Sequence, residues 1–441
     1  MKPYDKYKAS GIEWLGEIPE HWEVKRVKDI FSVINGSTPE SSKENFWDGE
    51  INWITPADML DFGQIGEGSR SIAKDGYLSC GTTILPIGSI ILSSRAPIGK
   101  VNLSTQKLCT NQGCKSLVNN KQDNLYFYYL LFSLQKVLTS YGRGTTFMEL
   151  GTNDLKNIKL LLPPHNTQTA IANYLNTKTT AIDRKIDLLT AKADKYKALR
   201  RSLINETVCR GLNPNAPMKD SGIEWIGKIP EHWQKFRMKD IGFLYSGLSG
   251  KAGDDFNQDD NQNNCDFIPF TNIFNNETIN PDIMGKVVVL ENEKQNRVKK
   301  NDIFFLMSSE DYDGLGKSSL LNYDLKNTYL NSFCKGFRLT KKKIFPAFLN
   351  YQLQSDTFRK IMQIEGKGFT RMNLKSEKVT GFEIFIPDTI EEQKKIVDFL
   401  DEKTTQIDSI LNNITEQINK LTQLRRTLIN DVVTGKIKVT Q

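Results

Sequence analysis

The sequence lacks the features that mark membrane proteins, disulfide-rich secreted proteins and zinc proteins. No run approaches the roughly eighteen apolar residues of a membrane helix, and the start, MKPYDKYKAS, contains no apolar signal-peptide region. The six cysteines form no CxxC pair, and the chain has only three histidines. We therefore expect a cytoplasmic protein with reduced, buried cysteines and without a structural zinc site.

Catalytic motifs are equally scarce. The sequence contains no GxGxxG segment, no DPPY or NPPF methyltransferase motif, and no nucleophile–histidine pair at a supporting spacing. Residues 313–319, DGLGKSS, imitate a phosphate loop, but a Walker A motif needs a glycine where the chain has Asp311. The acidic residues of segment 387–394 imitate a nuclease signature, but they lie where a helix begins and favour its positive end. We expect no catalytic, cofactor or metal site in this chain.

Length and composition predict two or three folded domains. The chain has 441 residues, of which 38% are hydrophobic and 10% aromatic, which is enough for packed cores. Its 59 basic and 52 acidic residues give a formal net charge of +7. This mild basic bias suits a nucleic-acid partner without requiring one.

An internal duplication organises the whole chain. Residues 10–22 read SGIEWLGEIPEHW and residues 221–233 read SGIEWIGKIPEHW, with 11 of 13 positions identical. GRGTTFMEL at 142–150 returns as GKGFTRMNL at 366–374. The pairs Trp14/Trp225 and Trp22/Trp233 of the opening motif are expected to pack at the start of each half.

The two copies differ most between these shared motifs. LRRSLIN at 199–205 returns as LRRTLIN at 424–430, and the offset grows from 211 residues at the first motif to 225 at this one. In between, only hints remain, such as SSRAPIGK at 93–100 against SSEDYDGLGK at 308–317. Similar motifs at both ends of each half, with dissimilar sequence between them, indicate two modules that perform the same function on different targets.

Each half is predicted to contain a mixed α+β globule followed by a long helix, so the fold class is α+β. Short β-type runs between Gly, Pro, Asn and Ser predict strands, and two apolar segments predict helices. The expected strands are 83–92, 115–118, 302–307 and 333–339, and the expected helices are 125–134 and 348–353. Prolines close both globules, which sets the boundaries at 1–162 and 213–386 for the globules and 163–212 and 387–441 for the helical segments.

Both helical segments have apolar residues at heptad spacing. The seven-residue series is Leu175, Ile182, Leu189, Tyr196 and Leu203 in the first, and Leu400, Ile407, Ile414, Leu421 and Leu428 in the second. Such a stripe needs a partner helix, and each segment is the obvious partner of the other in an antiparallel coiled coil. Packing in some other bundle is the alternative. Thr389 and Glu392 form the pattern of a capping box at the second start.

The GIEWxGxIPEHW opening, the GxGxT segment and the LRR[ST]LIN helix end, in tandem order, resemble the specificity subunits of type I restriction–modification systems. The resemblance covers essentially the whole chain. It implies two target-recognition domains, each followed by a conserved helical spacer, in a non-catalytic subunit that binds double-stranded DNA. It also implies two modification (methyltransferase) subunits as partners, with S-adenosylmethionine, and restriction subunits with ATP, Mg and the translocation and cleavage activities.

The expected geometry agrees with that role. Antiparallel pairing in the order globule–helix–globule–helix relates the globules by a pseudo-two-fold axis in a circular arrangement, as duplex DNA relates its half-sites. The 28 residues from Leu175 to Leu203 span roughly 42 Å at about 1.5 Å per residue, against about 34–36 Å for one DNA turn. We therefore expect a bipartite, asymmetric target with an unread gap that the helices set.

Basic and short polar side chains on the Gly-rich connections are the expected DNA contacts, because loops reach grooves and phosphates. The candidates are Ser94, Arg95, Lys100, Lys115, Arg143 and Thr146 in the first half, and Ser309, Lys317, Lys335, Lys367, Thr370 and Arg371 in the second. The equivalent pair Arg143 and Lys367 is interpreted as phosphate-binding, and base readers should lie where the halves differ. Ordinary solvated charge is the alternative for each residue.

Two other function classes remain open from the sequence. A self-contained DNA enzyme would methylate DNA with S-adenosylmethionine alone. A helical scaffold whose globules bind protein would retain no duplex DNA, with or without a modification subunit.

Overall fold

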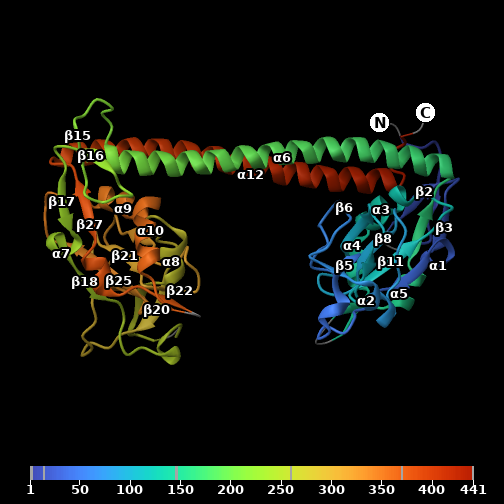
Figure 1. The fold of residues 1–441 in the computed structure, drawn as a ribbon, viewed down its shortest axis with the longest axis horizontal. Coiled ribbons are helices and arrows are strands. Elements are labelled where there is room, and N and C mark those ends of the chain that lie inside the picture. Colours follow the sequence, from blue (N-terminus) through green and yellow to red (C-terminus); the bar gives the residue numbers. More distant parts are fainter. Residues whose placement is uncertain (1–2, 13–14, 145–147, 259–260, 369–370, 440–441) are drawn as a thin grey trace. The chain divides into compact units, whose positions relative to one another are not determined.

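The computed structural model describes residues 3–12, 15–144, 148–258, 261–368 and 371–439. It divides the chain into unit 1, Met1–Thr190 with Thr415–Gln441, and unit 2, Ala191–Ile414. Helix α6 (His165–Arg210) begins in unit 1 and ends in unit 2, whereas α12 (Ile390–Val433) begins in unit 2 and ends in unit 1 (Figure 1). Each unit therefore contains one end of each long helix, and the two helices run antiparallel.

Unit 1 contains two sheets and a helical layer. The five-stranded sheet has the order β4 (Ser32–Asn35), β11 (Cys114–Val118), β8 (Ile90–Ser93), β9 (Val101–Ser104) and β6 (Gln64–Ile65). The three-stranded sheet has the order β10 (Cys109–Thr110), β5 (Trp47–Ile54) and β7 (Arg70–Ile72), with β10 parallel to β5. The helices are α1 (Val27–Ile30), α2 (Lys74–Ser79), α3 (Asn124–Ser133), α4 (Gln135–Ser140) and α5 (Thr152–Asn157).

Unit 2 repeats this order of strands, except that its larger sheet has four strands and only the isolated bridge Thr278–Leu320 where unit 1 has β6. Its larger sheet has the order β18 (Gly242–Ser246), β25 (Cys334–Leu339), β21 (Ile303–Leu306) and β23 (Ser318–Leu320). Its smaller sheet has the order β20 (Gly285–Val288), β19 (Asn264–Ile268) and β24 (Thr328–Leu330), with β24 parallel to β19. The helices are α7 (Met238–Ile241), α8 (Phe270–Asn275), α9 (Pro346–Gln354), α10 (Asp356–Glu365) and α11 (Ser376–Thr380).

Two-stranded ribbons frame both globules. The pairs are β1 (Tyr7–Ala9) with β2 (Glu17–Pro19), β3 (Glu23–Arg26) with β14 (Lys159–Leu162), β15 (Met218–Asp220) with β16 (Lys228–Pro230), and β17 (Gln234–Arg237) with β27 (Glu383–Ile386). The strand that closes each globule thus pairs with the strand that opens it, directly before the long helix begins. The duplication read from the sequence is therefore a duplication of topology.

The ends of the long helices belong to the cores of the globules. In unit 1, Leu175 of α6 and Val432 of α12 are fully buried in the same cluster as Tyr126 of α3. In unit 2, Val208 of α6 and Leu400 of α12 are fully buried in one cluster. Because burial of each such side chain contributes about 1.5–3 kcal/mol, the helix ends are fixed to their globules.

The heptad stripes face inward in both helices. Leu175, Leu400, Ile407 and Ile414 are buried, and the remaining six positions of the two series are partly buried (Ile182, Leu189, Tyr196, Leu203, Leu421 and Leu428). Most positions between them are exposed, as a two-helix seam requires.

The first turn of α12 modifies the expected capping box. The Thr389 hydroxyl accepts a hydrogen bond from the Glu392 amide at 3.2 Å, as expected. The Glu392 carboxylate instead binds the Trp233 indole N–H at 3.1 Å and the His232 ring at 2.9 Å. Glu392 therefore connects the helix start to the second opening motif.

Gly435 and Gly211 occupy similar places just after the long helices, Gly211 directly after α6 and Gly435 two residues after the end of α12. The Tyr7 hydroxyl donates to the Gly435 carbonyl at 3.0 Å, and a Cβ on Gly435 would meet Pro19 at 2.5 Å. A Cβ on Gly211 would meet the ring of Trp233 at 3.4 Å. In unit 2 the chain runs on from this glycine into its opening ribbon, whereas in unit 1 the same junction forms without a covalent link.

Most predicted elements are confirmed, with one error in the strands. The segments expected at 115–118, 302–307, 333–339, 125–134 and 348–353 correspond to β11, β21, β25, α3 and α9. Only the end of 83–92 is a strand, because Gly88 has φ of +80° and the Ser89 amide closes a turn on the Pro86 carbonyl. A continuous apolar run thus contains a turn.

The two tryptophans of the opening motif differ in burial. Trp22 and Trp233 are fully buried, as expected. Trp225 is 59% exposed, so the packing expected for it is wrong, and Trp14 lies outside the described residues.

All six cysteines are free thiols. Four are buried (Cys109, Cys114, Cys209 and Cys334), whereas Cys80 and Cys265 are partly exposed, which corrects the expectation of uniform burial. No described helix is long and apolar enough to cross a membrane.

Candidate nucleic-acid interface

The shared GxG segment forms a hairpin in each globule. In unit 1, β12 (Gly142–Arg143) pairs with β13 (Glu149–Leu150), and the Leu150 amide donates to the Ser94 carbonyl at 2.8 Å. In unit 2, the backbones of Lys367 and Asn373 exchange hydrogen bonds at 3.0 and 3.2 Å. There β26 (Met372–Asn373) pairs with β22 (Ser308–Ser309). Each hairpin therefore lies against the segment that follows the matching strand, Ser94–Arg95 after β8 and Met307–Ser308 after β21, so the serine pairs of the two halves are not at equivalent positions.

A tight turn beside each hairpin is built in the same way in both units. The Asn111 side-chain oxygen accepts from the Gly113 amide at 2.9 Å, and the Ser94 amide donates to the Gly113 carbonyl at 2.8 Å. The Asn331 side chain accepts from the Phe333 amide at 3.0 Å, and the Met307 amide donates to the Phe333 carbonyl at 3.4 Å. The hairpin, the turn and the segment after β8 or β21 thus form one hydrogen-bonded scaffold per unit.

Exposed basic side chains lie on this scaffold. The Arg143 side chain is 78% exposed and pairs with Asp154 at 3.2 Å, and Arg95 pairs with Glu149 at 3.0 Å. In unit 2, Lys367 and Arg371 are exposed. Exposed ion pairs of this kind contribute little to stability, so the cations can exchange a carboxylate for a phosphate.

Several other sequence candidates are buried in the scaffold. Ser94 is 0% and Ser309 3% exposed. Lys115 is 5% exposed and lies 3.6 Å from Glu149, and the partly buried Lys335 lies 3.5 Å from the Ser246 hydroxyl. Ser94, Ser309 and Lys115 are thus part of the packed scaffold, whereas Lys335 is only partly withdrawn from the surface. Thr146 and Thr370 lie outside the described residues.

Lys100 and Lys317 have the same structural role in the two units. Lys100 Nζ donates to the Met59 carbonyl at 2.8 Å and lies 3.1 Å from Asp61. Lys317 Nζ donates to the Phe274 carbonyl at 3.0 Å, and burial, with the nearby Arg359 charge, lowers the pKa of Lys317. These contacts explain why the two segments resemble each other. The apparent phosphate-loop lysine points into its own globule.

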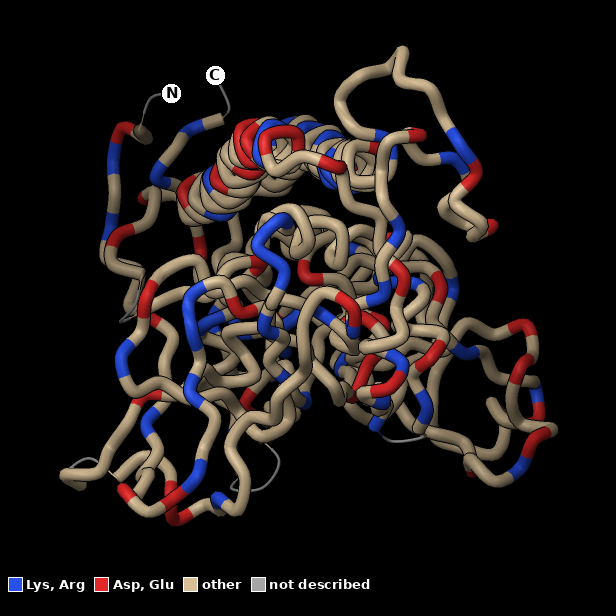
Figure 2. Tube along the Cα trace, turned by 90° about the vertical axis from the view of Figure 1, so that its left-hand side faces the viewer, with Lys and Arg blue, Asp and Glu red and all other residues tan. Residues whose placement is uncertain are grey.

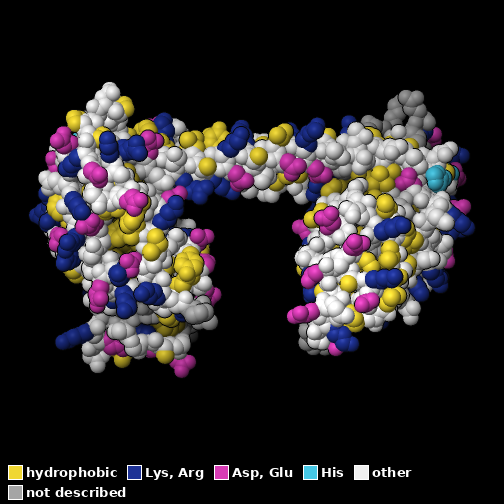
Figure 3. Space-filling model, in the orientation of Figure 1, with side chains coloured by type: hydrophobic (Ala, Val, Ile, Leu, Met, Phe, Trp, Pro, Cys, Tyr) yellow, Lys and Arg dark blue, Asp and Glu magenta, His cyan; other side chains and the backbone are white. Residues whose placement is uncertain are grey.

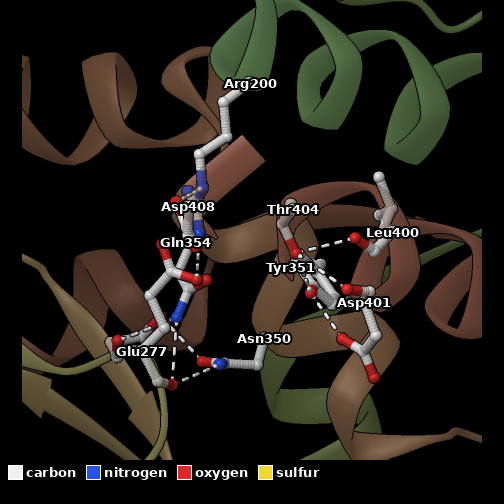
Figure 4. Close-up of polar contacts among 10 residues, drawn as sticks. Arg200, Glu277, Asn350, Tyr351, Gln354, Leu400, Asp401, Thr404 and Asp408 are labelled. Atoms are coloured by element: carbon white, nitrogen blue, oxygen red, sulfur yellow. Dashed lines mark hydrogen bonds and ion pairs between the residues drawn. The ribbon is translucent and has the colours of Figure 1, made fainter. Parts of the chain in front are cut away.

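In each unit, an arginine between the two long helices was not predicted from the sequence. Arg425 of α12, with 14% of its side chain exposed, forms an ion pair with Asp183 of α6 in unit 1. Arg200 of α6, 20% exposed, pairs with Asp408 of α12 at 3.2 Å in unit 2 (Figure 4). Both arginines belong to the repeated LRR motif. The two arginines lie 225 residues apart, and so do the two aspartates, which is the repeat offset, so the signal was present in the sequence.

Each arginine also binds its globule, through different chemistry. The Arg425 guanidinium lies 4.1 Å from the ring centroid of Phe62, whereas Arg200 donates to the Glu277 carboxylate at 2.8 Å. Phe62 and Glu277 are equivalent, because each follows by three residues the carbonyl that accepts from Lys100 or Lys317. Despite its burial, the pKa of Arg200 is raised by the hydrogen bond to Glu277 and by the charges of Glu277 and Asp408.

Neighbouring polar contacts connect α9 to the same helices. The Glu277 carbonyl accepts from the side chains of Asn350 at 2.9 Å and Gln354 at 3.1 Å. The Tyr351 hydroxyl donates to Asp401 of α12 at 2.5 Å, and burial and this carboxylate raise the pKa of Tyr351 well above its usual value (Figure 4). The globule of unit 2 is therefore joined to the paired helix ends by a connected set of polar bonds.

Charged and potential metal-ligand residues are distributed over the described part of the chain. Both basic and acidic residues occur on the helical segments, which Figure 2 shows end-on. Among the described residues, no group of three His, Cys, Asp or Glu side chains is arranged to hold a metal ion.

Comparison with known proteins connects this arrangement to one family. A family model described as the type I restriction modification DNA specificity domain matches residues 19–195 and again residues 230–420. The chain is 31% identical over 242 residues to the type I restriction enzyme MjaIX specificity subunit of Methanocaldococcus jannaschii, covering 53% of this chain and 54% of that protein. It thus spans about half the length of that relative.

Two further likenesses extend over nearly the whole chain. The MjaVIII specificity subunit of the same organism is 23% identical over 426 residues, which cover 96% of this chain and 94% of that protein. A solved chain from a study of complex assembly and conformational transition of a type I R-M system is 15% identical, with a TM-score of 0.69 over 95% of this chain and 99% of that chain, and shows the same fold. Because the family model covers both halves, the chain belongs to the family of type I restriction–modification DNA specificity subunits.

Proposed function

We propose that the chain reads an asymmetric, bipartite DNA sequence, with each globule reading one half-site. The observation that carries this proposal is the duplicated scaffold, in which the hairpin, the turn and the segment after β8 or β21 recur with different side chains, such as Ser94 and Met307. A shared backbone frame holds two readers in equivalent poses, and the residues that differ give each half-site its own sequence. The long helices, as spacers, set the unread gap.

Phosphate contacts come from the exposed cations at equivalent places on the hairpins. Arg143 and Lys367 both follow the first glycine of the shared segment and are both exposed. Because phosphates carry no sequence information, equivalent residues in two readers of different sequence suit phosphates better than bases. Arg95 and Arg371 extend this surface in their respective units.

The modification subunits bind the side chains of the LRR motif that are exposed and face away from the partner helix. Leu199 and Leu424 are 51% and 55% exposed, and Arg201 and Arg426 are exposed as well. On the face shown in Figure 3, hydrophobic side chains reach the surface of the helical segments between charged ones. Packing within the chain explains the inward half of this repeated motif but not the outward half. A partner present in two copies explains why both helices carry it.

The chain itself supplies recognition and assembly, not chemistry. S-adenosylmethionine binds to the modification subunits, and ATP with Mg binds to the restriction subunits, which join through the modification subunits. The support is the scarcity of catalytic motifs in the sequence and the structural roles of the two segments that imitate them.

A module graft tests the reading proposal. Residues 23–141 are replaced by the equivalent segment of a relative with another specificity, and the methylated sequence is mapped in cells that contain the modification subunits. One half-site should change while the other half-site and the gap remain. A change in both half-sites, or in neither, would contradict the assignment of one globule to one half-site.

Single and double helix variants test the docking proposal. Leu199→Arg or Leu424→Arg should each remove one modification subunit from the complex, and the double variant should remove both, as measured by light scattering after gel filtration. Leu188→Arg is the matched control, because Leu188 is 66% exposed on α6 but lies outside the repeated motif. Equal loss with the control, or full assembly of the double variant, would contradict this docking face.

A further inference from the structure

We infer that Phe333 and Arg371 form a base-reading element of unit 2, in which the phenyl ring contacts a base of the half-site and positions the arginine for its neighbour. The inference rests on the proposed function and names side chains that give one globule its specificity.

The backbone around Phe333 is fixed, although its side chain lies at the surface. The Asn331 side chain accepts from the Phe333 amide, the Phe333 carbonyl accepts from Met307, and the Cys334 amide donates to the Asn331 carbonyl at 3.1 Å. The Phe333 side chain is nevertheless 50% exposed. Because this turn is already ordered, binding a ligand through the ring costs little further conformational entropy.

Arg371 lies over this ring. Its guanidinium carbon is 4.9 Å from the Phe333 ring centroid, and the side chain is exposed. Arg371 belongs to the hairpin segment that also carries Lys367, so the ring and the proposed phosphate contact lie on one scaffold. A guanidinium stacked on a ring keeps its in-plane N–H donors free for a base edge or a phosphate.

The equivalent turn of unit 1 carries no side chain at this position. Gly113 replaces Phe333 in the same hydrogen-bonded turn, and a Cβ there would meet Pro56 at 2.9 Å and the Asn111 side chain at 3.2 Å. The scaffold is therefore common to both units, while the group that it presents differs. This is the pattern expected of a residue that distinguishes two half-sites.

The chemistry of the pair suits a base step better than a phosphate alone. A phenyl ring makes apolar contact with a thymine methyl group or a base face, and arginine donates to the O6 and N7 acceptors of guanine. A phosphate-binding site would gain nothing from the exposed ring. Packing of a protein partner on the ring is the competing explanation, and the experiment separates the two.

The test compares methylation maps of the assembled methyltransferase containing wild-type chain, Phe333→Ala, Phe333→Leu or Arg371→Lys. Phe333→Ala should relax discrimination at least ten-fold at one or two adjacent positions of the half-site read by unit 2. Phe333→Leu should be intermediate, and Arg371→Lys should relax the neighbouring position because lysine cannot bind bidentately. The half-site read by unit 1 and the gap should stay unchanged. Phe243→Ala is the control, since Phe243 is 48% exposed in β18 of the same unit.

Each outcome separates this inference from the proposed function. A wild-type map without a bipartite sequence overturns the proposed function. A wild-type bipartite map with an unchanged unit 2 half-site in Phe333→Ala and Arg371→Lys overturns only the base-reading element. Loss of a modification subunit with unchanged specificity assigns the ring to a protein contact and also overturns it. Melting temperatures within about 2 °C of wild type show that the variants fold.

Discussion

Removal of the seam aspartates should affect the two units unequally. Asp183→Ala leaves Arg425, which is 14% exposed, with the Phe62 ring but without the carboxylate with which it pairs. Asp408→Ala leaves Arg200 with Glu277, at 2.8 Å. A mostly buried cation that loses its hydrogen-bonded anion costs about 2 kcal/mol. A cation that keeps one of two partly exposed partners loses about 0.5–1 kcal/mol.

Hydrogen exchange followed by mass spectrometry measures this difference locally. A loss of about 2 kcal/mol corresponds to roughly thirty-fold faster exchange of amides near Arg425, against about two- to five-fold near Arg200 in Asp408→Ala. Asp187→Ala is the control, because Asp187 is exposed on the same helix one turn after Asp183. Full-length chain in its assembled complex is used for every variant.

Two outcomes would contradict this prediction. Equal acceleration by Asp183→Ala and Asp408→Ala would show that Glu277 does not compensate for the lost aspartate. If neither variant exceeded Asp187→Ala, the ion pairs would not stabilise the seam, and its register would depend on the apolar stripe alone.

Three further predictions concern DNA, spacing and thiols. Arg143→Ala and Lys367→Ala should weaken binding to target and non-target DNA alike and reduce the salt slope by about one each, whereas loss of discrimination at a single base pair would assign the residue to base reading. Four residues inserted after Leu189 lengthen α6 by roughly 6 Å and should widen the unread gap by about one or two base pairs with unchanged half-sites, and an unchanged gap would exclude the helices as spacers. In native protein, Cys80 and Cys265 should react with a thiol reagent at pH 8 while the four buried thiols react only on unfolding, and six rapid reactions would contradict the described cores.

The parts of the fold that follow a period or a repeat were predictable from the sequence. The heptad series depends on local spacing, so both helices and their inward faces could be read from one chain. The duplicated motifs predicted two equivalent globules, because similar segments that recur in the same order fold alike. The Phe333 turn was visible only as a difference at a shared Asn-x-x-Cys pattern.

The parts that depend on long-range contacts were not predictable. Arg200 and Arg425 lie between the helices at positions that a hydrophobic pattern does not identify. The aspartates with which they pair lie on the other helix, more than two hundred residues away in the sequence. Lys100 and Lys317 read as exposed cations on Gly-rich connections, yet both point inward to backbone carbonyls that only the folded globule provides. Composition and local sequence patterns do not reveal partners that come from distant parts of the chain.

The junction between the Gly435 segment and the first opening ribbon has a consequence for synthesis of the protein. Unit 1 contains Thr415–Gln441, so its core stays open while the ribosome makes all of unit 2. At about 5–20 residues per second, this delay lasts on the order of ten to forty seconds. During that time Trp22 and the start of α6 lack the α12 segment that covers them. A chain truncated before this segment therefore lacks Ile429, Val432 and Val433 of the unit 1 core and leaves the side chains that they cover exposed.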